Sequence, residues 1–324
     1  MTKIDLITGI LGAGKTTFLR RIAEFCIRRG EKIAILENDF GAVNVDMMML
    51  RDLQSDRCHL EMICGCCDPQ SHRRRFRTQL ISLGMQHFDR VIMEPSGIFD
   101  MDEFFDILYE PPLDNWFSIG SILTVIDAGT DNILPEEMEY LLGSEAAYAG
   151  KLIVSKLRDG IPLPEQAVHT ANRINRAMEQ IRCARRFTAE DVLCKPWDAL
   201  TEDDFAALTA ASYRKADYVK QFRGEELCSG VHYYMNLQIP PEQIEPVLQS
   251  LFSDAKCGKI RRIKGSLPGE HNTRLKINAT ADAVEIAPVL QGQSVLIVIG
   301  EDLNHEAIDR HFRAVNTDPA YMSI

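Results

Sequence analysis

Residues 9–17, Gly-Ile-Leu-Gly-Ala-Gly-Lys-Thr-Thr, constrain the fold of this chain more than any other stretch. They match the pattern G-x-x-x-x-G-K-[ST] at every fixed position, after a short apolar stretch (residues 4–7) and before a stretch of helical composition (residues 17–29). In such a unit, glycines let backbone N–H groups turn toward a phosphate, and the helix presents its positive end to the same anion. The predicted loop residues are Gly9, Gly12, Ala13, Gly14, Lys15, Thr16 and Thr17. Lys15 would contact the β- and γ-phosphates and the Thr16 hydroxyl would bind Mg²⁺, so the sequence predicts a nucleoside triphosphate site.

Length and composition limit the class of protein. A chain of 324 residues is long enough for two domains, and 45% hydrophobic with 26% charged residues is typical of a soluble globular protein. The formal net charge of −11 argues against a nucleic-acid partner, and no apolar run is long enough to cross a membrane. Because the N-terminus leads directly into a strand, we expect no signal peptide and a cytoplasmic protein whose nine cysteines are reduced.

The first two-thirds of the chain alternates short apolar segments with segments of helical composition. The expected strands are Lys3–Thr8, Lys32–Glu37, Arg90–Glu94, Ile119–Asp127 and Lys151–Ser155, with a further short edge strand at Arg182–Arg186. The expected helices are Thr16–Arg29, Ser71–Met85, Met101–Leu108, Pro135–Tyr148 and Pro164–Met178. This alternation predicts an α/β fold with a doubly wound, mostly parallel sheet of the P-loop NTPase type.

The last third of the chain has a different pattern, in which aromatic and β-branched residues alternate with polar ones from Val231 to Ile239. After this strand, the expected elements are a helix at Pro241–Phe252, strands at Lys259–Gly265, Arg274–Ala279, Ala283–Ala287 and Val295–Ile299, and a closing helix at Asn304–Arg313. We therefore predict a P-loop nucleotide-binding domain at residues 1–212, a linker at residues 213–227 and a smaller α+β C-terminal domain at residues 228–324.

Acidic residues follow two of the predicted strands, in Glu-Asn-Asp-Phe-Gly at residues 37–41 and Glu-Pro-Ser-Gly at residues 94–97. In open α/β sheets, ligands bind at the carboxyl ends of the strands, where carboxylates hold Mg²⁺ or orient the water that attacks the γ-phosphate. The predicted catalytic residues are Lys15, Glu37, Asp39 and Glu94. The Gly97 N–H is expected to contact the γ-phosphate. A solvated loop is the competing interpretation for residues 37–41, and a buried, paired acid is the competing one for Glu94.

Three cysteines lie close together in the run Cys64-Gly-Cys66-Cys67. Three thiolates at this spacing converge on one soft ion, Zn²⁺ or another transition metal, with Zn–S distances of about 2.3 Å. Such an incomplete set leaves the fourth tetrahedral position to another residue, to water or to a partner. Candidates for the fourth ligand are Glu37, His59, Glu61 and His72. A dithiol redox switch and buried structural cysteines are the alternative interpretations.

Taken together, these motifs resemble the CobW-like P-loop GTPases, the metallochaperones of the CobW/HypB/UreG class. The resemblance is carried by residues 9–17, 37–41, 64–67 and 94–97, and in the second domain by Arg261–Gly265 and Val295–Leu303. It implies that binding and hydrolysis of GTP with Mg²⁺ are coupled to the capture of a transition metal by Cys64, Cys66 and Cys67. It also implies that the metal is delivered to a client metalloprotein or a cofactor pathway.

One segment departs from the pattern of that family. After the fifth predicted strand the family carries Asn-Lys-x-Asp, whose Asp reads the guanine edge and whose Lys packs on the base, whereas this chain has Ser-Lys-Leu-Arg at residues 155–158. Lys156 is therefore the expected base contact. Arg158 has only hydrogen-bond donors and cannot accept from guanine, and Asp159 stands one residue too late. We expect GTP to be preferred with weaker discrimination than usual, so that ATP also binds.

The sequence thus predicts a nucleotide-hydrolysing metallochaperone, a monomer or a nucleotide-dependent dimer, with a nucleoside triphosphate, a metal ion and an unknown client metalloprotein as partners. Two other functions fit the same residues. One is a nucleotide-regulated thiol redox or metal-sensing switch, and the other is a P-loop small-molecule phosphotransferase. Metal binding by the reduced protein separates the first two functions, and phosphate release without an acceptor disfavours the third.

Overall fold

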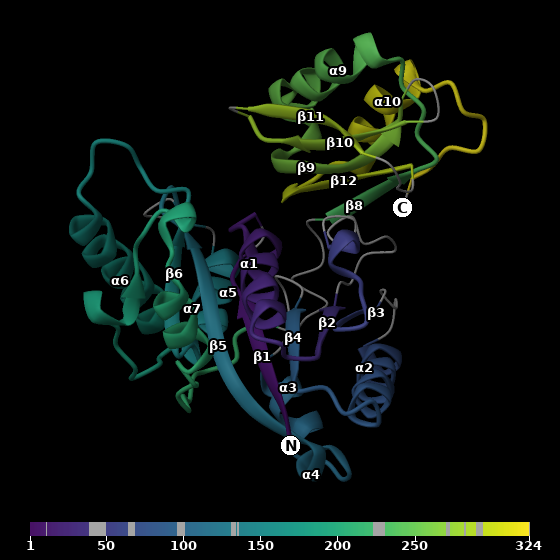
Figure 1. The fold of residues 1–324 in the computed structure, drawn as a ribbon. Helices are drawn as coiled ribbons and strands as arrows, with labels where there is room; N and C mark the ends of the chain where they lie inside the picture. Colours follow the sequence, from purple (N-terminus) through teal and green to yellow (C-terminus); the bar gives the residue numbers. More distant parts are fainter. Residues whose placement is uncertain are drawn as a thin grey trace. The chain divides into compact units, whose positions relative to one another are not determined.

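The computed structural model describes residues 1–10, 12–38, 50–63, 69–95, 101–130, 134, 136–222, 231–269, 273–281, 283–289 and 294–323. These residues form two compact units, one within residues 1–222 and one within residues 231–323 (Figure 1). The described part of the predicted linker belongs to the first unit. Tyr213 pairs with Ala149, and the Val219 N–H donates to the Ile181 carbonyl at 2.8 Å. The predicted domain boundaries stay a prediction.

The first unit is built on a parallel sheet of seven strands within the described residues, in the order β3-β2-β4-β1-β5-β6-β7. The strands are β1 Thr2–Thr8, β2 Ile33–Asn38, β3 Cys58–Ile63, β4 Arg90–Pro95, β5 Phe117–Asp127, β6 Lys151–Ser155 and β7 Val192–Leu193. The helices are α1 Lys15–Arg28, α2 Pro69–Gly84, α3 Met101–Leu108, α4 Leu113–Trp116, α5 Glu136–Ala147, α6 Leu163–Gln180 and α7 Glu202–Thr209. The predicted doubly wound α/β sheet is therefore confirmed.

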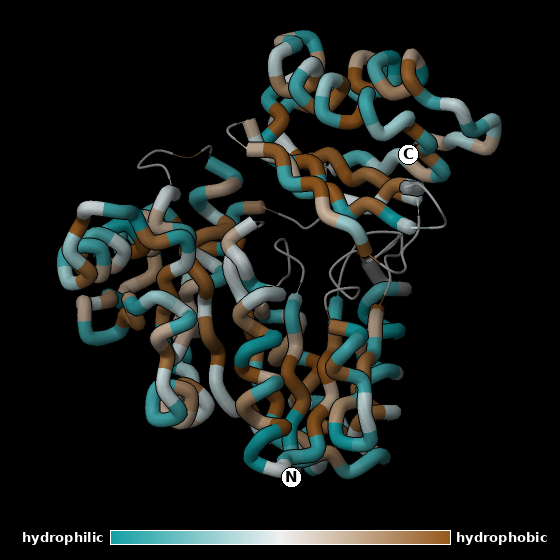
Figure 2. The backbone as a smooth tube through the Cα atoms, turned by 45° about the horizontal axis from the view of Figure 1, so that its top comes forward, coloured by the Kyte–Doolittle hydropathy of each residue, from teal (hydrophilic) through white to brown (hydrophobic). Residues whose placement is uncertain are grey.

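The central strands are apolar on both faces, which is why they read as continuous hydrophobic runs. All six residues of β2 and all six of β4 are buried, as is all of β1 except Lys3. A parallel sheet whose strands are buried on both sides must be covered by helices on both sides. Figure 2 shows hydrophobic segments concentrated in the strands of this sheet, and Figure 1 shows β1 between β4 and β5.

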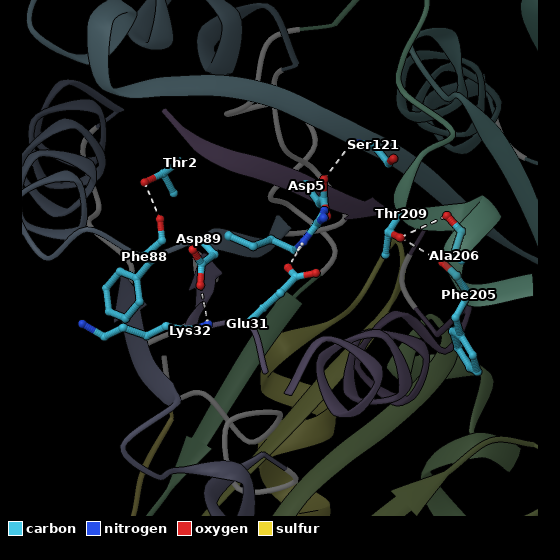
Figure 3. Close-up of polar contacts among 11 residues, drawn as sticks. Thr2, Asp5, Glu31, Lys32, Phe88, Asp89, Ser121, Phe205, Ala206 and Thr209 are labelled. Atoms are coloured by element: carbon cyan, nitrogen blue, oxygen red, sulfur yellow. Dashed lines mark hydrogen bonds and ion pairs between the residues drawn. The ribbon is translucent and has the colours of Figure 1, made fainter. Parts of the chain in front are cut away.

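A network of charged side chains links β1 to the start of β4 and to β5. The guanidinium of Arg90 donates to Asp5 and, at 2.9 Å, to Glu31, and the Asp5 carboxylate also accepts the Ser121 N–H at 2.6 Å. Figure 3 shows the contact between Asp5 and Ser121 with Glu31 nearby, and a second contact between Lys32 and Asp89. Because every charge has an opposite partner, this network tolerates its burial.

Several elements differ from the sequence expectations: helices α4 and α7 and strands β3 and β7 are not predicted, and one predicted strand is wrong. Strand β3 is not predicted, because its half-exposed side chains show no clear alternation. The edge strand expected at Arg182–Arg186 is wrong: Arg182 adopts a left-handed φ of 55°, and the Arg185 guanidinium is turned back to donate to the Ala147 carbonyl at 2.7 Å. The edge position belongs instead to β7, which pairs with β6 over two residues.

The described residues of the second unit form an antiparallel sheet and two helices. Within the described residues, its strand order is β11-β10-β9-β12-β8-β13. The strands are β8 Val231–Met235, β9 Lys259–Pro268, β10 Arg274–Ala279, β11 Val284–Val289, β12 Val295–Glu301 and β13 Met322–Ser323, and the helices are α9 Pro241–Ser253 and α10 His305–Val315. One hydrophobic core joins helices and sheet, with Leu248 from α9, Phe312 from α10 and Ile263 from β9. The predicted smaller α+β domain is confirmed.

In the part of the chain that the structure describes, no helix is both long enough and apolar enough to span a membrane.

Candidate nucleotide and metal site

The loop between β1 and α1 has the backbone that its glycines predict. Gly9, Gly12 and Gly14 have φ values of 131°, 85° and 97°, a region that side chains with a Cβ rarely adopt. A Cβ on Gly9 would lie 2.3 Å from the carbonyl oxygen of Val125 on β5, so the loop can approach the sheet only with glycine at this position. Helix α1 begins at Lys15, directly after Gly14, and its first N–H groups therefore face the loop.

Lys15 and Thr16 meet the acid that ends β4. The Thr16 hydroxyl donates to Glu94 Oε1 at 3.1 Å, and Lys15 Nζ lies 4.0 Å from the same oxygen. All three side chains are buried. The predicted phosphate-binding lysine, the predicted Mg²⁺ hydroxyl and one predicted catalytic acid are thus brought together at the carboxyl edge of the sheet.

Strand register brings a second acid to the same place. Glu37 of β2 pairs with Glu94 of β4, and residues opposite one another on neighbouring strands present their side chains on one face. Glu37 is buried as well. The Thr16 hydroxyl and nearby carboxylates are the hard oxygen ligands that Mg²⁺ prefers, directly or through water, so these residues fit that ion. Asp39 and Gly97, also predicted to act here, lie outside the described residues.

A third buried carboxyl group, Glu145 on α5, is not predicted by the sequence analysis. Its Oε2 accepts the backbone N–H of Gly9, and its Oε1 is buried without a hydrogen-bond partner among the described residues. The hydroxyls of Thr8 and Thr124 hold its backbone carbonyl at 3.1 and 3.0 Å. Burial raises the pKa of Glu145 to about 7, although Lys15 and the Gly9 N–H act in the opposite direction.

Only a tertiary contact gives Glu145 this position. In the sequence it is one of several acids on a predicted helix, with no motif around it. The only available signal is that Glu145 stands in an otherwise apolar run, Leu-Leu-Gly-Ser-Glu-Ala-Ala at residues 141–147, on the buried side of α5. A charged residue at such a position is buried only with a partner or in its neutral form.

Residues 155–158, the segment expected to read the base, are held by hydrogen bonds and an ion pair to Asp127 and Gln166. Lys156 has a φ of 47° and its Nζ binds Asp127 Oδ2 at 2.6 Å. The backbone N–H of Arg158 donates to Gln166 Oε1 at 2.9 Å, and Gln166 Nε2 donates back to the Arg158 carbonyl at 3.1 Å. Arg158 and Asp159 are both exposed. The role of Lys156 at the base stays a prediction.

Trp197 is a further residue at this site that the sequence analysis misses. A Cβ on Gly14 would lie 3.2 Å from the indole Cη2, and the ring centroid is 5.1 Å from that of Phe18 on α1. The indole N–H donates to the carbonyl of Val154 at 3.0 Å, one residue before the base segment begins. Trp197 therefore links the phosphate loop to that segment. Its rarity is the available signal, because the chain has only two tryptophans.

The predicted metal ligands Cys64, Cys66 and Cys67 lie outside the described residues. The strand β3 ends one residue before them, and Ile63 at its end pairs with Asn38 at the end of β2. Side chains near this edge are engaged with one another. His59 Nε2 lies 2.7 Å from Glu61 Oε1, and the buried His72 holds the Asn38 side-chain oxygen at 2.7 Å.

Candidate fourth ligands therefore have other contacts in this structure. Burial lowers the pKa of His72, and the nearby Arg75 acts in the same direction, so the imidazole is neutral and donates from Nε2 to Asn38. His59 and Glu61 contact each other on β3. Glu37 faces Glu94 across the strand pair. Which of the four completes the cysteine site stays a prediction.

The glycine loop between β1 and α1, with lysine, threonine and a strand-end glutamate around it on a parallel sheet, defines a P-loop NTPase fold. The family described as CobW/HypB/UreG, nucleotide-binding domain, matches residues 3–188, more than half of the chain. The chain belongs to this family.

Three relatives resemble the chain over part of their length. Zinc chaperone YjiA of Escherichia coli is 30% identical over 162 residues, which is 47% of this chain and 48% of the relative. Zinc chaperone YeiR of the same organism is 31% identical over 39% of this chain and 38% of the relative. Zinc-regulated GTPase metalloprotein activator 1 of Schizosaccharomyces pombe is 28% identical over 42% and 34%. The chain spans about half the length, or less, of these curated relatives.

Proposed function

We propose that this chain is a nucleotide-hydrolysing metallochaperone that prefers GTP. It binds zinc or another transition metal at Cys64, Cys66 and Cys67 and transfers the metal to a client protein. Membership of the CobW/HypB/UreG family supports the nucleotide part of this proposal. The relatives' names, zinc chaperone and zinc-regulated GTPase metalloprotein activator, support the metal part.

The contacts at the end of β4 support a triphosphate with Mg²⁺ as the bound nucleotide. Lys15 binds the phosphate oxygens, and the Thr16 hydroxyl and Glu94 hold the ion directly or through water. When bound, Mg²⁺ neutralises charge on the phosphate oxygens. Glu37 and Asp39 orient the attacking water from the neighbouring strand end.

One observation carries the coupling of nucleotide to metal: the order β3-β2-β4-β1 at one end of the sheet. Glu94 of β4 contacts Thr16, Glu37 of β2 pairs with Glu94, and Asn38, the next residue of β2, pairs with Ile63 at the end of β3. The cysteine segment starts at the following residue. Since neighbouring strands are about 4.8 Å apart, only two strand spacings separate the end of β4 from the end of β3, so a change at the phosphates is transmitted over a short distance to the residue that precedes the cysteine motif.

Nucleotide turnover tests the first part of the proposal. Lys15→Met keeps the aliphatic stem and removes the ammonium, and should reduce GTP hydrolysis to background while the far-UV circular dichroism stays unchanged. Lys3→Met on β1 is the matched control, since Lys3 is exposed and distant from the loop end of that strand. If Lys15→Met hydrolyses GTP and ATP at the rate of the Lys3→Met control, the phosphate-loop assignment is wrong.

Metal binding tests the second part. Reduced protein should bind Zn²⁺ with an affinity that differs between the GTP-bound and GDP-bound forms, and replacing Cys64, Cys66 and Cys67 by serine should abolish that difference. Cys194→Ser, which changes a cysteine outside the predicted motif, should preserve it. A nucleotide-dependent zinc affinity that survives the triple substitution would place the cargo ligands elsewhere. A disulfide among the three cysteines that forms and breaks with nucleotide state, without zinc binding, would favour the redox switch.

A further inference from the structure

Three potential metal ligands of different kinds meet in the second unit, far along the chain from the cysteine motif. Asp254 follows the end of α9, Cys257 closes the short 3-10 turn Ala255–Cys257, and His311 lies on α10. One ligand atom of each residue lies within 4.8 Å of the others. In a tetrahedral site with bonds of about 2.0–2.3 Å, ligand atoms are roughly 3.3–3.7 Å apart, so only small side-chain shifts separate this cluster from that geometry.

The Ser250 hydroxyl contacts the ring nitrogen of His311 that is turned away from Asp254. Ser250 Oγ donates its hydrogen to the Val247 carbonyl at 2.8 Å, and the same oxygen lies 3.0 Å from His311 Nδ1. With the hydroxyl hydrogen on the Val247 carbonyl, Ser250 accepts from Nδ1–H. In that tautomer of the neutral ring, Nε2 carries a lone pair. Zinc-binding histidines show this arrangement, in which the nitrogen away from the metal donates to a neighbouring oxygen.

Asp254 is oriented in a complementary way. Its Oδ1 accepts the backbone N–H of Lys256 at 2.9 Å, which leaves Oδ2 facing His311 Nε2 at 3.0 Å. At this distance Oδ2 and Nε2 are joined either by a proton on Nε2, giving an ordinary hydrogen bond or ion pair, or by a metal ion bound by both atoms.

The position of Cys257 favours a metal ion over a proton between Asp254 and His311. An ion pair with a proton needs no third group, yet a buried thiol lies beside it, held by its own backbone: the Cys257 N–H donates to the Asp254 carbonyl at 2.9 Å, and its carbonyl accepts the Asn304 N–H at 3.1 Å. A thiolate and a carboxylate together neutralise a divalent cation.

We propose that Asp254, Cys257 and His311 form a second metal site that binds one zinc-class divalent ion, with the fourth position open to water or to a ligand from a partner. The mixed sulfur, nitrogen and oxygen set suits four-coordinate Zn²⁺. The site lies wholly within the second unit and needs neither the nucleotide nor the Cys-x-Cys-Cys motif. It is therefore independent of the proposed function.

Cobalt binding tests the site in the chain of residues 1–324. In a background in which Cys64, Cys66 and Cys67 are replaced by serine, reduced protein titrated with Co²⁺ should bind one equivalent with the intense thiolate-to-cobalt absorption, and Zn²⁺ should displace it. Adding Cys257→Ser should abolish that absorption. Cys183→Ser, which changes a buried cysteine of the first unit, is the control and should leave the absorption unchanged.

Graded variants guard against a result that reflects only misfolding. His311→Gln and Asp254→Asn change half-buried side chains and should weaken Zn²⁺ binding by at least a hundredfold. Ser250→Ala removes only the hydrogen bond that orients the ring and should weaken it by roughly tenfold to a hundredfold. If the triple-serine background shows no thiolate–cobalt absorption, or if His311→Gln binds zinc as tightly as its parent, the residues form a proton-bridged ion pair beside a core cysteine and the proposal fails.

Discussion

Replacing Glu145 by glutamine should stabilise the first unit above neutral pH. The carboxyl group is fully buried, one oxygen accepts the Gly9 N–H, and the other has no partner among the described residues. Glutamine has nearly the same shape and keeps a carbonyl oxygen for the Gly9 N–H, but it cannot ionise. The substitution therefore removes the cost of a buried charge and keeps the contact that supports the phosphate loop.

The magnitude follows from the change in pKa on folding. Burial raises the pKa of Glu145 from 4.5 to about 7, so the folded state binds the proton more tightly than the unfolded chain does. Its stabilising contribution is complete below pH 4.5 and is lost as the pH rises through 7. At 1.36 kcal/mol for each pKa unit, the full difference is about 3.4 kcal/mol, of which about 3 kcal/mol falls between pH 4.5 and pH 8.

Urea unfolding from pH 4.5 to pH 8, without nucleotide, measures this difference. Both tryptophans of the chain, Trp116 and Trp197, lie in the first unit, so intrinsic fluorescence reports the unfolding of that unit alone. The wild-type chain and Glu145→Gln should have similar free energies of unfolding near pH 4.5. At pH 8 the variant should be more stable by about 3 kcal/mol.

Glu139→Gln on the same helix is the control with the opposite sign. Glu139 binds Arg173 through two hydrogen bonds of 2.5 and 2.9 Å, and both side chains are buried. Neutralising Glu139 removes the carboxylate charge that accepts both of these hydrogen bonds, which should destabilise the unit by about 3–5 kcal/mol. If Glu145→Gln has the same pH dependence of stability as the wild-type chain, Glu145 ionises as freely as an exposed acid and the argument from its burial is refuted.

Three other substitutions have defined outcomes. Arg90→Met leaves Asp5 buried without its counter-ion and should lower the free energy of unfolding by about 3–5 kcal/mol in urea titrations, with partial recovery when Asp5→Asn is added. Trp197→Phe keeps an aromatic ring and loses the indole N–H bond, which should cost about 1 kcal/mol by thermal denaturation followed by circular dichroism, whereas Trp197→Ala should cost more. Ser155→Asn combined with Arg158→Asp should raise the ratio of GTP to ATP affinity by roughly tenfold to a hundredfold in competition titrations; an unmoved ratio would mean that this segment does not read the base.

Much of the fold follows from local pattern. The central strands are predicted within one or two residues of their bounds, because burial on both faces leaves continuous apolar runs. The edges of the sheet are harder. Strand β3 is half exposed and β7 pairs over two residues, so neither carries a periodic signal. The strand predicted at residues 182–186 does not form. The arginines of this segment donate to nearby backbone carbonyls, and its backbone does not pair with a neighbouring strand.

The candidate site also contains residues that the local sequence predicts and residues that only tertiary contacts place. The phosphate loop is a local structure, and its motif predicts its glycine conformations, its lysine and its threonine. The meeting of Glu37 with Glu94 depends on strand order, which the sequence suggests only through the general rule for α/β sheets. Glu145 and Trp197 reach the loop from residues more than a hundred positions away. No spacing rule in the sequence connects them to it.

The strand that leads into the phosphate loop is synthesised well before either of the strands that pair with it. Strand β1 ends at Thr8, but its neighbours are β4, which starts at Arg90, and β5, which ends at Asp127. At roughly 5–20 residues per second on the ribosome, β1 waits on the order of 6–25 seconds for both partners. Over that interval the nascent chain holds Gly9 without the Val125 carbonyl against which it packs, and Lys15 without Glu94. A chain interrupted during synthesis therefore carries the phosphate motif without a phosphate site.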